Sequence, residues 1–485
     1  MSYDRLIKIL LVILGAIFYG LFLSHKINLV TADLGRHLIN GQIFWDKGKI
    51  LTTNYYSYTQ VGFEVFNHHW LAGAVFYKIW QAGGFVGLQL FFIILSVASF
   101  AIMFWIGVNS GNILLATLLV LPAISLLAER MEIRPEALTY FFVSCFFLIL
   151  TKYQNSRWVW LLPLLQLFWV NSHIYFFLGP LLIVCFLLGK PSYKLLALLV
   201  ICSLITLINP FGFRGVIEPL TIFNNYGYRL AENQPIRLIE KLIPNRNYLI
   251  FKLMFLTLWL SFGYVAVKLK KIPVTNLLIA VGISIAGWLA LRNLALFGLL
   301  AGPIMVMNFS MAVKNNQNQS FLAVTLLAVA IAVFSLTNRF GLGLEPGNSK
   351  AMEFFKEQNL SGPIFNNYDI GSFLIFYLFP KEPVFVDNRP EAYPAEFFKQ
   401  VYVPMQEKES VWQEQLKKYQ FNAIIFSIND YTPWGQQFLI SRVKDPEWAV
   451  VFADFRVIIF LRRNDQNQPI IDKFEVPQER FRISK

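Results

Sequence analysis

Long apolar runs divide this 485-residue chain, and they limit what it can fold into. Most have about the length with which a helix crosses a bilayer, although 158–170 and 194–208 are short. With 56% hydrophobic and only 15% charged residues, the chain is too apolar for a water-soluble body of this size. We predict an α-helical polytopic membrane protein with about 11 transmembrane helices. The predicted spans are 6–23, 85–106, 112–128, 136–150, 158–170, 174–188, 194–208, 248–267, 273–290, 294–311 and 320–337.

Basic residues collect in alternate loops, which predicts the orientation. Cytoplasmic loops of membrane proteins are rich in Lys and Arg. A cytoplasmic N-terminus places most of the basic loop residues inside, with Asp4 as the only acid among them: Arg5, Lys8, Lys152, Arg157, Lys190, Lys194, Lys268, Lys270, Lys271 and Lys314. An odd number of spans then puts the C-terminus outside. We expect a multi-pass protein of the cell (inner) membrane.

The distribution of basic residues and the end of the first apolar run support two further interpretations. The basic residues are dispersed, so the net charge of +13 does not indicate a nucleic-acid partner. Ser24, His25 and Lys26 follow the first apolar run without a small-residue cleavage site. We therefore interpret that run as a retained anchor and not as a signal peptide.

The chain changes character near residue 338. Residues 1–337 are predicted to form the membrane domain, with outer loops 24–84 and 209–247. Residues 338–485 alternate helical and strand patterns, which is typical of a small α/β domain, and the orientation makes this domain extracytoplasmic. Its expected helices are 351–358, 395–406 and 411–419, and its expected strands are 383–387, 422–426, 448–452 and 457–461.

The first outer loop begins with a polar stripe. At helical spacing, Asp33, Arg36, His37 and Asn40 share one face, and leucines occupy another. The pattern predicts an amphipathic helix on the membrane surface. Asp33 then has two interpretations: an N-cap of that helix, or a general base held near the hydroxyl that it activates.

His68 and His69 close the same loop. Adjacent histidines on a regular element point in different directions, and no Cys or Glu stands at ligand spacing beside them. A divalent metal site is therefore the disfavoured alternative. Hydrogen bonding to a substrate, or to Asp33, is the favoured one.

The densest charge cluster at a membrane boundary contains Glu129, Arg130, Glu132, Arg134 and Glu136. It precedes a predicted helix, whose N-terminus carries a partial positive charge. The two arginine forks suit a phosphate group. The structural alternative is interfacial snorkelling with internal Glu–Arg pairing.

Other polar residues are expected on the same side of the membrane. Ionisable groups at membrane depth are costly, which favours a functional role, although turn formation or a structural hydrogen bond explains each one alone. In the tail, two residues follow a predicted strand, where α/β domains tend to hold ligands; a structural Asp–Arg pair is the alternative there. These candidates are Asn171, His173, Glu232, Arg292, Asp387 and Arg389.

With these residues in place, the chain resembles the GT-C superfamily of membrane glycosyltransferases. It is most similar to a bacterial polytopic branch related to the protein mannosyltransferases and the aminoarabinose transferases. The resemblance covers nearly the whole chain, through short motifs: Tyr56-Ser57-Tyr58-Thr59, His69-Trp70-Leu71, Arg134-Pro135, Asn171-x-His173, Asn209-Pro210-x-Gly212 and Asp387-x-Arg389.

The resemblance implies transfer of a hexose or pentose from a polyprenyl-phosphate carrier to an unidentified extracytoplasmic acceptor, with inversion. Asp33 matches the position of the family's catalytic acid. Many members of the family carry paired acids there, whereas this chain has Asp33-Leu34-Gly35. That departure counts against a metal-dependent mechanism of the oligosaccharyltransferase kind, so a divalent metal is possible but not favoured.

The mechanism that we expect is direct displacement at the anomeric carbon. Asp33 takes the proton of the acceptor hydroxyl, helped by His37 or by His68 and His69. Arginines 130, 134 and 292 stabilise the charge that develops on the leaving phosphate. Three alternatives stay open: a lipid-linked glycan ligase without a carboxylate base, a flippase or transporter, for which charges near mid-span would be expected, and a non-catalytic membrane assembly factor.

Overall fold

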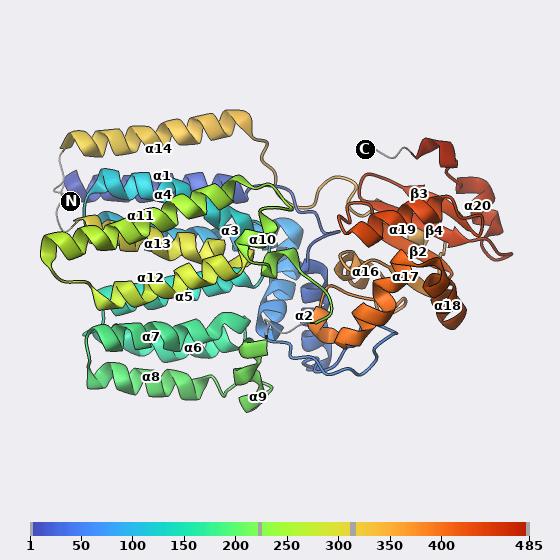
Figure 1. The fold of residues 1–485 in the computed structure, drawn as a ribbon, viewed down its shortest axis with the longest axis horizontal. Helices are drawn as coiled ribbons and strands as arrows, with labels where there is room; N and C mark the ends of the chain where they lie inside the picture. The colour runs from blue at the N-terminus through green and yellow to red at the C-terminus, as the bar shows by residue number, and fades with distance from the viewer. Residues whose placement is uncertain (1–2, 222–225, 311–316, 482–485) are drawn as a thin grey trace. The chain divides into compact units, whose positions relative to one another are not determined.

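The computed structural model describes residues 3–221, 226–310 and 317–481, so Lys314 lies outside the described residues. The fold is mostly helical with one small sheet (Figure 1). The chain divides into two compact units. Unit 1 comprises Met1–Lys26, Phe85–Phe223 and Leu230–Leu342, and unit 2 comprises Ile27–Gly84, Asn224–Arg229 and Gly343–Lys485. Most of the predicted outer loop 24–84 therefore packs with the C-terminal segment.

Each predicted apolar run falls on a helix. Inside a bilayer no water is available, so the backbone N–H and C=O groups must form hydrogen bonds with one another. Within the described ranges, six helical segments are long and apolar enough to cross a membrane: Tyr3–Leu23, Trp70–Ser110, Ile113–Arg130, Arg246–Leu269, Leu291–Ser310 and Gln319–Thr337. Four shorter apolar segments are Arg157–Val170, Ile174–Gly189, Tyr193–Ile205 and Val274–Leu289. The chain is a multi-pass membrane protein, as predicted, and the number of crossings stays a prediction.

The helices of unit 1 lie side by side (Figure 1). They are α1 (Tyr3–Leu23), the second part of α3 (Trp70–Ser110), α4 (Ile113–Leu127), α5 (Glu136–Lys152), α6 (Leu161–Val170), α7 (Leu178–Gly189), α8 (Tyr193–Ile205), α9 (Gly212–Ile217), α10 (Ile236–Ile239), α11 (Arg246–Leu269), α12 (Val274–Leu289), α13 (Leu294–Ser310) and α14 (Gln317–Thr337). Gly84, at φ +60°, interrupts the helical backbone of α3 where the two units divide.

The core of unit 1 is built around α13, which packs against α4, α11 and α12. A Cβ atom on Gly298 would lie 3.0 Å from Leu126 Cβ, so the glycine lets α13 approach α4 closely. The amide nitrogen of Asn308 donates to Ser261 Oγ over 2.9 Å and joins α13 to α11. Small residues and one buried hydrogen bond thus hold the central helix in place.

Unit 2 contains a four-stranded sheet of order β1-β2-β4-β3, in which β1 is parallel to β2 and the other pairs are antiparallel. The strands are β1 (Ile364–Asn366), β2 (Ala423–Ser427), β3 (Trp448–Ala453) and β4 (Val457–Arg462). The helices are α2 (Leu34–Lys47), the first part of α3, α15 (Lys350–Glu357), α16 (Gly371–Leu378), α17 (Pro404–Glu407), α18 (Glu409–Tyr419), α19 (Pro433–Val443) and α20 (Gln468–Phe474). The predicted small α/β domain is confirmed, with β1 in addition.

One predicted strand is wrong. Residues 383–387 are not a strand of the sheet; only an isolated bridge pairs Val384 with Ser57. Side chains supply the hydrogen bonds that a neighbouring strand would otherwise make with Phe385. Its backbone nitrogen donates to Asn366 Oδ1 over 2.9 Å, and its carbonyl oxygen accepts from Ser57 Oγ over 2.9 Å. The apolar residues of this stretch are buried, as the pattern requires, but their partners come from elsewhere in the chain.

The predicted surface helix also needs correction. Helix α2 forms where expected, but its first two turns are buried on their polar side as well. Tyr56 Oη donates to Asn40 Oδ1, and the ring of His69 lies against the ring of His37, while α16 packs on the side of α2 that contains Gly35. The polar stripe therefore faces protein.

Candidate functional site

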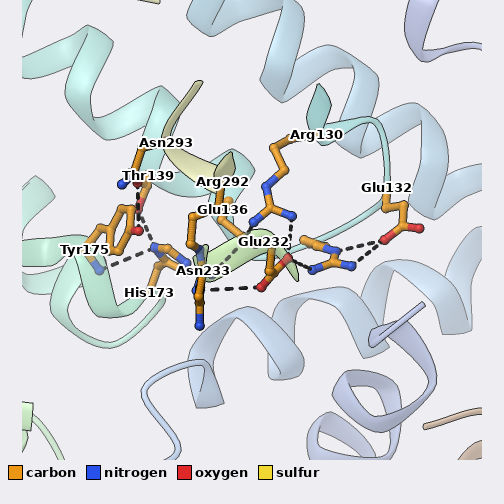
Figure 2. A network of polar contacts seen from close by, with 11 residues as sticks. Arg130, Glu132, Glu136, Thr139, His173, Tyr175, Glu232, Asn233, Arg292 and Asn293 are labelled. Atoms are coloured by element: carbon orange, nitrogen blue, oxygen red, sulfur yellow. Dashed lines mark hydrogen bonds and ion pairs between the residues drawn. The ribbon is translucent and has the colours of Figure 1, made fainter. Parts of the chain in front are cut away.

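Unit 1 contains a network of three arginines and two glutamates, here called the arginine network (Figure 2). Glu232 is its centre: its carboxylate lies 2.7 Å from Arg130 Nη1, 3.1 Å from Arg134 Nη1 and 3.7 Å from Arg292 Nη1. Glu136 is the second acceptor, 3.1 Å from Arg292 Nη2 and 3.4 Å from Arg130 Nη2. Three guanidinium groups thus converge on one carboxylate.

The network is assembled from four separate segments of the chain. Arg130 ends a short 3₁₀ turn after α4, and Glu136 begins α5. Glu232 lies in a 3₁₀ turn of the second long loop, and Arg292 in the turn before α13. Glu132 extends the network outward through Arg134, at 2.6 Å. Short turns at helix ends thus bring charges together that lie far apart in the sequence.

The network is largely shielded from solvent, with the side chains of Arg130 and Arg292 11% and 16% exposed. Burial alone would raise the pKa of Glu232, but Arg130, Arg292 and Arg134 together lower it well below its ordinary value. Within the described residues, Nε and Nη2 of Arg130 and Nε of Arg292 have no hydrogen-bond partner. The network therefore sets three guanidinium groups against the carboxylates of Glu136, Glu232 and Glu132, and it leaves Nε of Arg130 and Nε of Arg292 as buried donors that an oxyanion can accept from.

The pH dependence of stability tests this account of Glu232. A carboxyl whose pKa is lower in the folded than in the unfolded protein stabilises the fold fully above the unfolded pKa, about 4.3. That stabilisation disappears as the pH falls through the folded pKa. We expect Glu232→Gln to lower the Tm at pH 7, and the difference from wild type to shrink steadily below about pH 4. Thermal unfolding in detergent between pH 3 and 8 measures this; a difference independent of pH would contradict it.

His173 lies beside the network and not within it. Its Nδ1 is 2.8 Å from Thr139 Oγ1, which also accepts a hydrogen bond from Trp169 Nε1 over 2.9 Å. Next to it, Tyr175 Oη donates to Asn293 Oδ1 over 2.9 Å (Figure 2). A chain of buried polar groups thus flanks the arginines.

Two predicted candidates have local structural contacts instead. Glu129 accepts hydrogen bonds from the amide nitrogens of Asn245 and Asn247. The amide nitrogen of Asn171 donates to the carbonyl oxygens of Leu167 and Ile208, at 2.9 Å each. In these contacts, the Asn171 amide ties two helix ends together.

An apolar cavity of about 370 Å³ lies among α5, α7, α12 and α13. Its wall is formed by residues such as Val143, Leu182, Ile283 and Leu300, whose side chains are aliphatic. Tyr175 and Asn293, the polar pair beside the arginine network, also line it. The cavity is therefore apolar over most of its wall and polar where it adjoins the charged groups.

In unit 2, Asp33 precedes the first turn of α2, and its side chain makes no capping hydrogen bond. Instead, the amide nitrogen of Asn388 donates to Asp33 Oδ1. Asp33 therefore stands at the N-cap position of α2, as the first interpretation expects, but its carboxylate makes no capping hydrogen bond there. Asn388 was not among the predicted residues; its only signal is its place between Asp387 and Arg389.

Asp387 and Arg389 form a buried ion pair with a distance of 2.6 Å. Arg389 also donates to Asn54 Oδ1 over 3.3 Å, and its guanidinium lies 5.3 Å from the ring centre of Tyr56. Burial alone would lower the pKa of Arg389, but the neighbouring Asp387 carboxylate raises this pKa by more than burial lowers it. The arginine therefore stays charged. The pair holds the short turn that presents Asn388 to the Asp33 carboxylate.

The predicted histidines lie in the same unit. The rings of His37 and His69 are edge to face, with centroids 5.5 Å apart. Burial lowers the pKa of His68 to about 4, so this imidazole is neutral at pH 7 and carries no charge for a phosphate. Among the described residues, no group of three His, Cys, Asp or Glu side chains is placed to hold a metal ion.

No family model matches this chain, and no curated protein sequence matches it. Solved structures are similar to this chain in their fold. The oligosaccharyltransferase AglB from Archaeoglobus fulgidus, in complex with an inhibitory peptide and a dolichol-phosphate, aligns over 96% of this chain and 75% of its own, with a TM-score of 0.56 and 13% identity. The apo form of the Archaeoglobus fulgidus oligosaccharyltransferase covers 90% of this chain and 71% of its own, with a TM-score of 0.54 and 12% identity. The chain therefore has the GT-C fold, as its motifs predict.

Proposed function

We propose that this protein is a membrane glycosyltransferase that transfers a sugar from a polyprenyl-phosphate carrier to an extracytoplasmic acceptor, with inversion. The observation that carries the proposal is the arginine network: three buried guanidinium groups around one carboxylate, beside an apolar cavity in a membrane unit. The similar AglB structure contains a dolichol-phosphate, a lipid phosphate of the same chemical kind.

The arginine network supplies the phosphate site of this proposal. A phosphate needs several donors at once, and the buried Nε groups of Arg130 and Arg292 are not used by Glu136 or Glu232. Charge that develops on the leaving phosphate is stabilised best by donors already in place. The adjoining cavity of about 370 Å³ is suited to part of an isoprenoid chain, since its wall is largely apolar.

Asp33 is the proposed general base. Its carboxylate accepts a hydrogen bond from Asn388, which fixes its orientation, and it makes no side-chain capping hydrogen bond on α2. Proton transfer to a positioned carboxylate contributes a rate factor of about 10²–10⁴. His37 and His69, in contact with each other, are proposed to orient the acceptor. The orientation expected from the loop charges places unit 2 outside the cytoplasm.

A direct assay tests the proposal. The full chain, purified in detergent and reconstituted in liposomes, is given radiolabelled undecaprenyl-phosphate sugars, first hexoses and then pentoses, with a lipid extract of the cell envelope as the acceptor. We expect one sugar to leave the carrier and appear in a new product, with release of undecaprenyl phosphate. Binding of the donor without transfer to any acceptor would favour a carrier or assembly role and contradict the proposal.

A further inference from the structure

Arg36 is a buried arginine without a counter-ion. It lies in the first turn of α2, and the residue is 6% exposed. Within the described part of the chain, its guanidinium forms no ion pair within 4.0 Å, and its Nε has no hydrogen-bond partner. Its backbone nitrogen donates a hydrogen bond to Ser372 Oγ, which fixes the backbone, but no carboxylate pairs with its side-chain charge.

The other buried arginines of unit 2 behave differently. Arg389, Arg442 and Arg456 are 3–5% exposed, and each is paired with a carboxylate. Arg456, for example, lies 2.7 Å from Glu345. Taking an arginine out of water costs several kcal/mol unless a partner compensates it. Arg36 alone among these four bears that cost, which indicates that its partner is a ligand.

The surroundings of Arg36 limit what that ligand can be. The charge of Arg36 acts on Glu391 and on Tyr56 at longer range, without an ion pair to Glu391. Asp33 lies one helical turn earlier, and helical side chains lean towards the N-terminus, so Arg36 and Asp33 project from the same end of α2. The first turn of a helix adds a partial positive charge to the guanidinium.

We propose that Arg36 binds a phosphate group, as an anion-binding residue separate from the arginine network. The planar guanidinium and the helix end together match a phosphate better than a neutral sugar hydroxyl. The phosphate has two sources, a lipid carrier or free inorganic phosphate. The inference rests on the proposed function only in naming the lipid carrier as one of them.

Two replacements separate binding from stability. Arg36→Met removes the charge and keeps the length of the side chain. We expect it to raise the Tm of the unliganded full-length protein by about 2–4 °C, because an uncompensated charge is relieved. We also expect it to weaken phosphate binding at least tenfold. The matched control is Arg456→Met, which removes the ion-pair partner of Glu345. It should lower the Tm while leaving the phosphate affinity unchanged.

The binding probes are inorganic phosphate and undecaprenyl phosphate, titrated by calorimetry against protein in detergent. Loss of affinity in Arg36→Met for inorganic phosphate alone assigns free phosphate, and loss for undecaprenyl phosphate, with or without loss for inorganic phosphate, assigns the lipid carrier. Arg36→Lys, which keeps the charge but not the fork, should bind with intermediate affinity. Affinities equal to wild type in both Arg36 variants, or a Tm lowered in Arg36→Met as in Arg456→Met, would overturn the inference. Neither readout requires sugar transfer, so a failed transfer assay leaves this test intact.

Discussion

Replacing Asp33 with Asn should lower the rate of sugar transfer by about 10²–10⁴, with little change in thermal unfolding. The amide oxygen of Asn can still accept the hydrogen bond from Asn388, so the turn after Asp387 keeps its contact. An amide cannot take a proton from an acceptor hydroxyl, so the chemical step loses its base. Initial rates with a labelled polyprenyl-phosphate sugar, at saturating donor, measure the loss in kcat.

The matched control is Asp46→Asn, an exposed carboxylate at the other end of α2. It changes the charge of the same helix by the same amount and should leave both the rate and the Tm unchanged. If the Asp33 variant transfers sugar at the wild-type rate, the general-base role is wrong, and a ligase without a carboxylate base becomes the better account.

The membrane helices could be predicted from the sequence because their signal is local. An apolar run such as 320–337 must be helical in a bilayer whatever surrounds it. The stretch 383–387 has an equally clear strand pattern, yet its pairing depends on Ser57, more than 300 residues earlier. No local pattern reports such a partner, so its burial was predictable and its sheet membership was not.

The candidate residues divide in the same way. Arg292 and Glu136 drew attention because each charge lies at the edge of an apolar run. Their contact joins residues 156 positions apart, which only the fold brings together. Asn388 had no signal of its own, because an amide next to an Asp–Arg pair is ordinary in a loop; only its contact with Asp33 distinguishes it.

The polar stripe on α2 shows a third kind of case. Spacing alone placed Asp33 and Arg36 on one face, and a polar face ordinarily indicates solvent. That face is buried against other residues of unit 2 instead: Tyr56 Oη donates to Asn40 Oδ1, and the ring of His69 lies edge to face with the ring of His37. The polar face of α2 is therefore not exposed to solvent, and its burial is what makes Arg36 informative, because no ion pair to Arg36 forms within the described residues.

Replacing Arg292 with Met should disrupt the arginine network. Arg292 contacts Glu136 at 3.1 Å and Glu232 at 3.7 Å, and it donates to Asn233 Oδ1 over 3.1 Å. Removing one partner of a buried ion pair leaves the other charge uncompensated, at a cost of about 3–5 kcal/mol. We expect a marked fall in the Tm together with loss of donor binding, measured by thermal unfolding and by titration with undecaprenyl phosphate.

The double variant Arg292→Met with Glu136→Gln separates these two effects. Glu136→Gln removes the carboxylate that loses its nearer arginine in Arg292→Met and keeps only Arg130 at 3.4 Å, so the Tm should recover in part, and the two changes should not be additive. Donor binding should not recover, because the guanidinium that it requires is still missing. If binding returned with the Tm, the arginine network would be a structural brace of the helix ends, and the phosphate would have to bind elsewhere.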